Sequence, residues 1–250
     1  MDLPWHQYVT FIDDKTLVEY DTREYGFVLD NDFTIEDAQA RRYEQLVPGR
    51  DGTLDLTDAL GGVHFENRLI TLPFTFNNKS MERFHYESSR IRRLLDGRRI
   101  RALFSTDPGY YWVGRCQVGT ELVFHGWMKL TVTIDAYPFK LALTSSYEPW
   151  RWDPFSFIDG TVTNPIDVVL NNQTKTVQLP KDPAAQKVIL WLNKGDSGQV
   201  SAKLTTDNTW HLLRRGENTF PEITLSATEE STLQLKGTGT VGVEYRVGSL

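Results

Sequence analysis

Hydrophobic and polar residues alternate along most of the first half of the chain, which is the pattern of strands that bury one face. We expect strands over residues 6–12, 16–20, 54–56, 67–76, 98–104, 110–118 and 126–139. Pro73 lacks a backbone N–H, so it would place its strand at a sheet edge or at a bulge. Residues 34–40 fit either a strand or a short helix.

One segment, residues 80–96, instead spaces its apolar side chains three and four residues apart, as an amphipathic helix does. Gly97 follows as the residue that would end this helix. We expect one face to be buried, formed by Met81, Phe84, Ser88, Ile91 and Leu95. The other face would be solvated, formed by Glu82, Arg83, Glu87, Arg90, Arg92 and Arg93.

The second half is expected to form many short strands with frequent turns, which favours a β-sandwich of jelly-roll or lectin type. We expect strands near 161–170, 174–179, 186–193, 199–205, 209–214, 218–225, 231–236 and 240–247. Turns are expected at Asn171-Asn172, 194–198 and 215–218. The fold class is therefore mainly β: an N-terminal sandwich with one helix over 1–142, a linker over 143–160 and a second sandwich over 161–250.

Composition agrees with a folded chain and excludes several classes of protein. Hydrophobic residues make up 40% of the 250 residues, and the net charge of −6 argues against a protein that coats nucleic acid. The lone cysteine, Cys116, cannot form an intramolecular disulfide and lies in an alternating run, so we expect it in a strand core. We expect no signal peptide and no membrane insertion, because no long apolar run is present.

Charge is distributed unevenly along the chain. Residues 1–60 carry 5 basic and 14 acidic side chains, whereas residues 61–159 carry 13 basic and 10 acidic. Two interpretations follow: a solvated surface, which is the more common case, or an acidic face that meets a basic face between identical subunits.

No catalytic or cofactor-binding motif stands out. Gly195-Asp196-Ser197-Gly198 is reminiscent of a serine-protease run, but none of the five histidines has the neighbours of a catalytic base. The histidines show no metal-ligand spacing, and no glycine-rich phosphate loop is present. Nothing singles out a pair of glycosidase carboxylates among the many acidic residues. We therefore expect neither enzymatic activity nor a cofactor.

The aromatic residues of the second half are the best ligand candidates. Trp191, Trp210 and His211 could stack on a saccharide, because aromatic faces pack on sugar C–H surfaces. The alternative for Trp191 is a place in the sandwich core, and this is the more common role of such a residue.

The order of several features in residues 1–140 resembles the distal tail (Dit) proteins of long-tailed bacteriophages. The resemblance lies in the turn and strand Gly49-Arg50-Asp51-Gly52 and Leu54-Asp55-Leu56, the strand 67–76, the arginine-rich helix with Asp96-Gly97-Arg98, Gly126-Trp127, and Tyr137-Pro138-Phe139-Lys140. The resemblance implies a structural virion protein of the tail tip, folded in the host bacterial cytoplasm, with a galectin-like sandwich as its C-terminal domain. It also implies a hexameric ring that joins the tail-tube protein to tail-tip or baseplate proteins, with a receptor-binding protein or a host surface glycan as a further partner.

Under this hypothesis, the subunit contacts would involve Arg50, Asp51, Arg90, Arg92, Arg93, Arg98 and Arg99. For Arg50 and Asp51, stabilising their own turn is an equally good interpretation. The rival hypotheses are a carbohydrate-binding module on a structural stem, through Trp191, Trp210 and His211, and a wall-degrading enzyme, for which the sequence offers no nucleophile or metal set.

Overall fold

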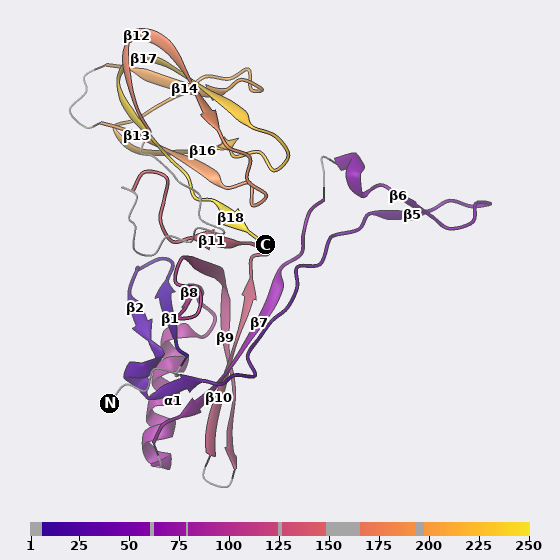
Figure 1. The fold of residues 1–250 in the computed structure, drawn as a ribbon, viewed down its shortest axis with the longest axis vertical. Coiled ribbons are helices and arrows are strands. Elements are labelled where there is room, and N and C mark those ends of the chain that lie inside the picture. The colour runs from indigo at the N-terminus through magenta and orange to yellow at the C-terminus, as the bar shows by residue number, and fades with distance from the viewer. Residues whose placement is uncertain (1–6, 61–62, 79, 125–126, 149–165, 194–197) are drawn as a thin grey trace. The chain divides into compact units, whose positions relative to one another are not determined.

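The computed structural model describes residues 7–60, 63–78, 80–124, 127–148, 166–193 and 198–250. The chain divides into two compact units, Met1–Lys140 and Leu141–Leu250, which are described in turn. Both units are built from strands, and the described residues contain one α-helix. This confirms the expected mainly β fold class (Figure 1).

Unit 1 is a single curled antiparallel sheet with the strand order β2-β1-β8-β9-β10-β7-β3. Its strands are β1 (Val9–Asp13), β2 (Glu19–Asp21), β3 (Phe27–Leu29), β7 (Arg68–Phe76), β8 (Arg99–Phe104), β9 (Tyr110–Phe124) and β10 (Trp127–Ala136). The sheet curls far enough for distant strands to meet. The Phe11 ring of β1 lies 6.4 Å from the Phe74 ring of β7, and the Leu29 N–H donates to the Gln7 carbonyl.

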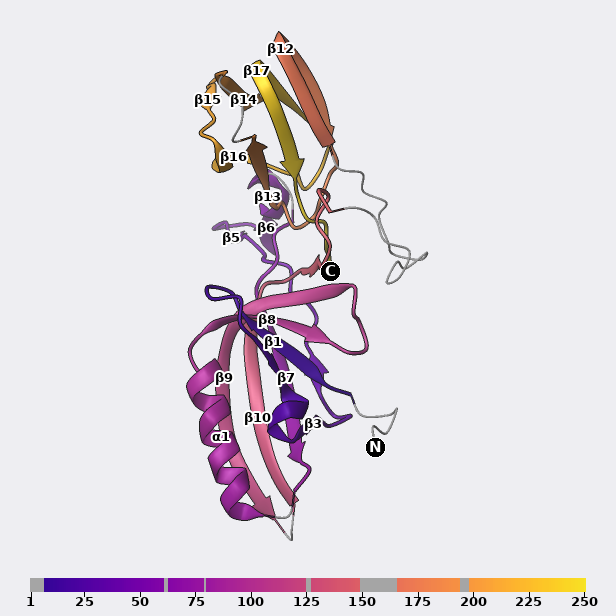
Figure 2. The same cartoon turned by 90° about the vertical axis from the view of Figure 1, so that its left-hand side faces the viewer.

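The core of unit 1 follows from strand alternation. Every second residue of β7 is buried, and the same holds for β1 and β8. Helix α1 (Met81–Leu95) lies along the sheet (Figure 2). It inserts Phe84, which is fully buried, against Phe27 and Phe76 at ring distances of 6.1 and 5.5 Å. Cys116 is also fully buried in this core, as the sequence predicted.

The helix boundaries agree with the prediction, but two of its side chains do not. Ser80 caps the start by accepting from the Arg83 N–H, and Gly97 follows the end with a φ of 71°. Met81, which we expected in the core, is 53% exposed at the first position of the helix. Glu87, which we expected in solvent, is buried, because it lies three residues after Phe84 and four before Ile91 and so shares their face of the helix.

Pro73 does not lie on an edge strand, nor at a bulge in the pairing of β7 with β10. β7 pairs with β10 on one side and with β3 and β4 (Thr34–Ile35) on the other. The Pro73 carbonyl accepts from the Asp30 N–H, in the gap between β3 and β4. The side of Pro73 that lacks an N–H therefore faces the gap between β3 and β4, where no ladder hydrogen bond is lost. Proline is tolerated there for the same reason as on an edge strand.

A two-stranded sheet, β5 (Glu44–Leu46) and β6 (Thr53–Asp55), lies outside the main sheet of unit 1. We call the segment 43–57 the hairpin arm. Figure 1 shows it extending away from the curled sheet, with the 3-10 helix Thr57–Leu60 after it. The strand that we predicted over 54–56 is therefore present, but it pairs within the arm. Residues 34–40 form the short strand β4 and otherwise no regular element.

Unit 2 is a second curled sheet, with the strand order β15-β14-β17-β13-β16 and β12 paired along β17. Its strands are β12 (Ile166–Leu179), β13 (Lys187–Leu192), β14 (Val200–Leu204), β15 (His211–Leu212), β16 (Gly216–Thr224) and β17 (Ser231–Glu244). The two ends of the path meet, because the His211 ring of β15 lies 4.8 Å from the Phe220 ring of β16. An aliphatic core fills the interior, built from residues such as Leu190, Val200 and Val241.

One turn and one strand break predicted in unit 2 are wrong. Asn171-Asn172 forms a bulge inside the continuous strand β12, where Asn172 has a φ of 56°. The ranges 231–236 and 240–247 belong largely to the single strand β17. The two break signals lie opposite each other in the ladder, because Gln173 pairs with Gly237. Pairing on both sides of this point holds each strand together where its local sequence favours a turn.

The start of unit 2 is packed, although we expected a linker to begin at 143. β11 (Lys140–Ala142) and β18 (Gly248–Ser249) pair with each other. Ser145 and Ser146 are buried, and the Ser146 hydroxyl accepts from the Tyr245 N–H. The rest of the expected linker, from 149 onward, lies outside the described residues, as do positions 194–197 of the turn expected at 194–198.

Candidate functional site: the hairpin arm and an aromatic pocket

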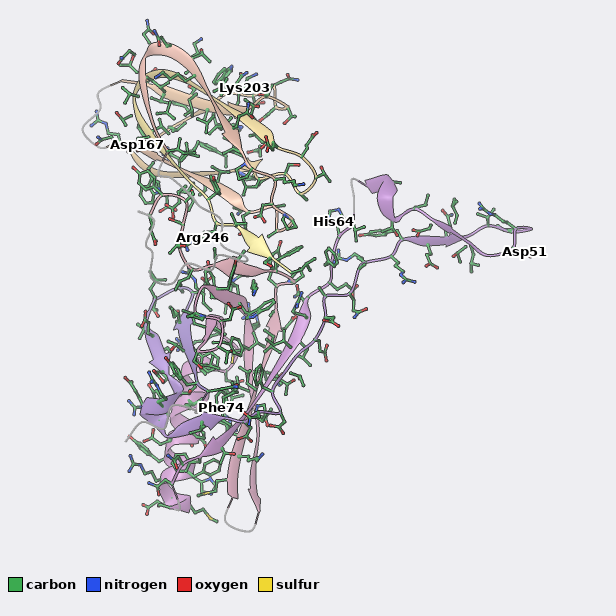
Figure 3. The ribbon with its side chains drawn as sticks, viewed as in Figure 1. Asp51, His64, Phe74, Asp167, Lys203 and Arg246 are labelled. Carbon is green, nitrogen blue, oxygen red and sulfur yellow. The ribbon has the colours of Figure 1, made fainter. Side chains whose placement is uncertain are left out.

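The interface candidates predicted from the sequence fall in two separate places of unit 1. Arg50 and Asp51 lie in the loop of the hairpin arm, and Figure 3 shows Asp51 at its tip. The arginines of the second group lie on α1 and at the start of β8: Arg90, Arg92, Arg93, Arg98 and Arg99.

Turn chemistry accounts for the shape of the arm. Val47-Pro48-Gly49-Arg50 forms a turn closed by the Arg50 N–H donating to the Val47 carbonyl at 3.2 Å. Proline followed by a residue of positive φ is the signature of a type II turn, and Gly49 has a φ of 80°. Gly52, with a φ of 76°, completes the reversal. Both glycines therefore adopt the positive φ that their turns require.

The arm has almost no buried surface. All residues from Glu44 to Thr53 are exposed, including Leu46, which is 79% exposed, and Val47. Arg50 and Asp51 are exposed as well. A two-stranded hairpin without a second layer is marginally stable in water, and its outer edges offer unpaired backbone groups. The arm therefore has the properties of a segment that a partner covers.

The arginines near β8 have acidic partners within the chain. Arg98 pairs with Asp13 at 3.1 Å, and Arg99 with Asp14 at 3.2 Å. Arg101, which was not among our candidates, also reaches Asp14 at 2.8 Å. No local pattern predicts these pairs, because 85 positions separate Arg98 from Asp13.

The helix arginines differ in exposure and contacts. Arg90 lies over the Tyr25 ring at 4.7 Å and 3.6 Å from the Glu87 carboxylate. Arg92 donates to the Gly119 carbonyl at 3.0 Å. Arg93 is exposed on the outer side of the helix. Arg50, Asp51 and Arg93 are therefore the candidates that the fold presents most openly to a neighbour.

Asp13 organises the turn between β1 and β2. One of its carboxylate oxygens accepts from the Thr16 and Lys15 N–H groups at 2.7 and 3.0 Å, and the other accepts from Arg98. The Thr16 N–H is the main cause that lowers the pKa of Asp13 to about 2, and the Arg98 guanidinium adds to the effect. This carboxylate therefore has a structural role in the turn.

In unit 2, the structure places the three predicted ligand residues in two different environments. Trp210 is 39% exposed, and the Lys203 ammonium lies 5.3 Å from its ring centre. His211 packs on Phe220 and lies 3.2 Å from the Asp207 carboxylate, which accounts for its partial burial.

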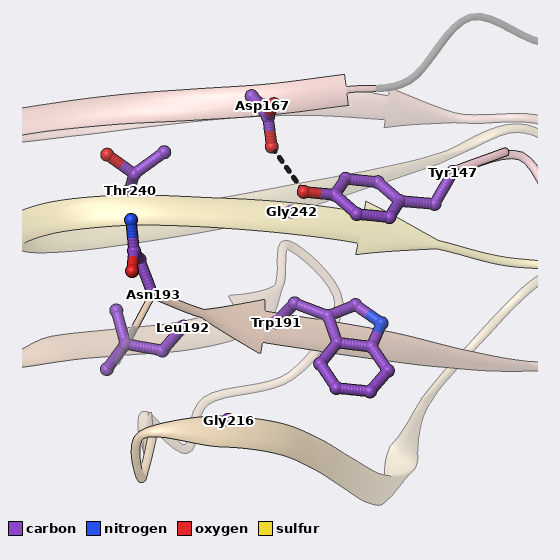
Figure 4. A pocket seen from close by; sticks show the side chains of 8 residues that line it. All are labelled: Tyr147, Asp167, Trp191, Leu192, Asn193, Gly216, Thr240 and Gly242. Atoms are coloured by element: carbon purple, nitrogen blue, oxygen red, sulfur yellow. Dashed lines mark hydrogen bonds between the residues drawn. The ribbon is translucent and has the colours of Figure 1, made fainter. Parts of the chain in front are cut away.

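Trp191 instead lines a pocket of about 330 Å³ together with Tyr147, Asp167, Leu192, Asn193, Gly216, Thr240 and Gly242 (Figure 4). The prediction grouped Trp191 with Trp210 from composition alone. It missed Tyr147, whose segment we had assigned to a linker.

No metal centre emerges from the residues that the structure describes. Among them, no three His, Cys, Asp or Glu side chains are grouped closely enough to hold a metal ion. Burial raises the pKa of the Cys116 thiol to about 12, which makes it a poor nucleophile. The run Gly195-Asp196-Ser197 lies outside the described residues. No described helix is long and apolar enough to cross a membrane.

Comparison with solved structures shows which fold this is. The chain superimposes on the SPP1 Dit (gp 19.1) protein, described as a paradigm of the hub adsorption apparatus in phages that infect Gram-positive bacteria. The TM-score is 0.59 at 13% identity, and the match covers 97% of this chain and 99% of that one. A chain of the phage p2 baseplate in its activated conformation with Sr matches at a TM-score of 0.41 and 9% identity, over 96% and 97% of the two chains.

No protein-family model and no curated protein matches this chain by sequence, although its fold matches a solved structure. The shared fold with SPP1 Dit extends over both units, although the resemblance seen in the sequence covered residues 1–140.

Proposed function

We propose that this chain is a distal tail protein of a long-tailed bacteriophage, a non-enzymatic hub that assembles as a ring of six copies at the tip of the tail tube. The observation that carries the proposal is the fold shared with SPP1 Dit over nearly the full length of both chains. Because one fold can serve several functions, the proposal also needs support from the surface of the chain itself.

The hairpin arm supplies that support. It exposes Leu46 and Val47, has no layer beneath it, and presents Arg50 and Asp51 at its tip. The occupant that we infer for this surface is the next copy of the same chain. An arm that packs on a different face of its neighbour makes a heterologous contact, and repeated rotation of such contacts closes a ring.

Charge supports the same arrangement. The arm belongs to the acidic segment 1–60, and Arg93 lies exposed on the basic segment that follows it. Opposite charges on two faces of one subunit favour head-to-tail contacts and fix their register. Arg98 and Arg99 contribute less, since Asp13 and Asp14 already neutralise them within the subunit.

In this function, one face of the ring would bind the tail-tube protein and the other a tail-tip protein. The central opening would let DNA pass without sequence-specific contacts. The location is the virion tail tip, and a receptor-binding protein is a further partner at the periphery.

Light scattering coupled to size exclusion tests the ring directly. The chain has a mass of 28.7 kDa, so six copies give about 170 kDa. We expect this species to form as concentration rises, and electron micrographs should show rings. Leu46→Asp places a charge in the proposed contact and should shift the mass toward 28.7 kDa.

Leu212→Asp is the matched control, because Leu212 is also an exposed leucine, at 57%, but lies in unit 2. This variant should assemble like the unaltered chain. A monomer at every concentration, or a ring that forms equally well with Leu46→Asp, would contradict the proposed assembly through the arm.

A further inference from the structure

The outer face of the unit 2 sheet carries the pocket that contains Trp191. We propose that this pocket binds a neutral saccharide, with Trp191 and Tyr147 as the stacking surfaces. Its volume of about 330 Å³ lies at the lower end of the range of small-ligand sites, roughly 300–1,000 Å³. The proposal rests on unit 2 alone and is independent of ring assembly.

Strand register places the pocket residues on one face. Asp167 of β12 pairs with Gly242 of β17, Gly242 pairs with Trp191 of β13, and Trp191 pairs with Glu217 of β16. Directly opposed residues of antiparallel strands point to the same side of a sheet. Their neighbours Val168, Val241 and Leu190 are buried in the core, so this row faces away from the core.

Gly242 creates the space in the centre of the row. A Cβ atom at this position would lie 2.6–2.8 Å from atoms of the Tyr147 ring, which is closer than packing allows. The aromatic ring therefore lies directly on the backbone of β17. Tyr147 is held there by its hydroxyl, which donates to the Asp167 carboxylate at 2.8 Å (Figure 4).

Trp191 is also fixed before any ligand arrives. Its indole N–H donates to the Glu244 carboxylate at 2.6 Å, which sets the orientation of the ring. Since this N–H is already used, the indole offers a ligand its ring surface. Two aromatic side chains held in place on one open face suit the flat C–H surfaces of pyranose rings, and pre-organisation lowers the entropy cost of binding.

Polar groups surround these rings with the chemistry that sugar hydroxyls need. Asp167 supplies carboxylate oxygens, Asn193 an amide and Thr240 a hydroxyl. The described lining residues include no lysine and no arginine, and Asp167 is exposed on the rim. Negative charge without a compensating cation disfavours anionic polymers, so the ligand class is a neutral saccharide rather than a phosphate-rich one.

Trp210 is a poor second site, although it is the more exposed of the two tryptophans. The Lys203 ammonium lies 5.3 Å from its ring centre, so a cation already occupies one ring face. It also lies outside the Trp191 pocket. This makes Trp210→Ala a matched control for Trp191→Ala, because both remove an indole from unit 2.

Saturation-transfer NMR and calorimetry on the full chain test the site. The probes are neutral gluco-, galacto- and N-acetylglucosamine oligosaccharides. Poly(glycerol phosphate) is the anionic probe for comparison. We expect one neutral class to bind and the anionic polymer not to bind. Trp191→Ala should weaken binding at least about tenfold, which corresponds to about 1.4 kcal/mol, whereas Trp210→Ala should leave it unchanged.

Trp191 is half-buried, so its replacement could also disturb folding. Asn193→Ala changes an exposed lining residue, and Tyr147→Phe removes only the hydroxyl that orients the ring. Both should weaken binding while the melting temperature of Asn193→Ala stays the same. Absence of binding to every neutral probe, binding only to poly(glycerol phosphate), or loss of binding with Trp210→Ala but not Trp191→Ala would overturn the proposal. The mass of the assembled ring, measured in parallel, tests the proposed function separately. A ring that forms but binds no saccharide would contradict only the saccharide site.

Discussion

Unit 1 contains two kinds of antiparallel pairing that differ in what lies behind them. The paired strands β7 and β10 bury side chains such as Ile70, Leu72 and Ile134 completely. The paired strands β5 and β6 bury none, and Leu46 is 79% exposed. Backbone hydrogen bonding alone therefore does not separate the two. The difference is a second layer. The curled sheet and α1 provide one for β7 and β10, whereas the hairpin arm has none.

In this unit the main sheet and α1 supply the stability, whereas the hairpin arm offers a surface for assembly. Complete burial of one large apolar side chain contributes roughly 1.5–3 kcal/mol to the free energy of folding, and the core of the main sheet has many such residues. The arm relies on its turn and a few hydrogen bonds, such as that from the Thr53 hydroxyl to the Glu44 carboxylate. A segment with so little internal support costs little to rearrange, which suits a surface completed by assembly.

The largest expected effect comes from disrupting the packing of α1 on the main sheet of unit 1. Phe84→Ala should lower the free energy of unfolding by about 3–5 kcal/mol, because it leaves a cavity against Phe27 and Phe76. Met81→Ala on the same helix should change it by less than about 1 kcal/mol, since Met81 is 53% exposed. Denaturant unfolding of both variants measures the difference. Equal effects would mean that α1 does not supply the second layer.

An intermediate effect is expected at the turn between β1 and β2. Asp13→Asn removes the ion pair with Arg98 and should cost about 1–3 kcal/mol at neutral pH. The Asp13 pKa is lowered from 3.8 to about 2 in the folded chain, so its contribution is complete above pH 3.8 and lost as pH falls toward 2. Unfolding measured from pH 2 to 7 should show the two proteins converge at the acid end. A constant gap would assign the loss to packing.

The smallest effect is expected in the arm. Leu46→Ala should change the unfolding free energy of the isolated subunit by no more than about 0.5 kcal/mol, because the side chain has almost no contacts to lose. Denaturant unfolding at concentrations below ring assembly is the appropriate measurement. A loss comparable to that of Phe84→Ala would show that the arm packs on its own subunit, and the contrast between the two regions would fail.

Several features could be predicted because short windows of sequence contain their causes. The helix boundaries follow from the capping serine Ser80 and from Gly97, and the arm turn follows from Pro48-Gly49 and Asp51-Gly52. Alternation was enough to place most strands and Cys116. The Dit-like fold was expected from the order of these features, and the comparison with SPP1 Dit agrees with it.

The remaining features depend on contacts between positions far apart in the chain. The local sequence predicts a turn at Asn171-Asn172 and a break between two strands around Gly237, yet ladder pairing holds both strands continuous. The ion pairs of Arg98 and Arg99 join β8 to the turn after β1.

Helix α1, the arm turn and most strands could be derived from local sequence, because capping, turn geometry and alternation act within a few residues. Which elements gain a second layer, and which residues share a surface, follows instead from contacts between distant parts of the chain. The row Asp167, Gly242, Trp191 and Glu217 exists only through the register of four strands, and Tyr147 joins it because glycine leaves room above β17. Register and layer packing arise from the energy of the whole unit, so no local window of sequence contains them.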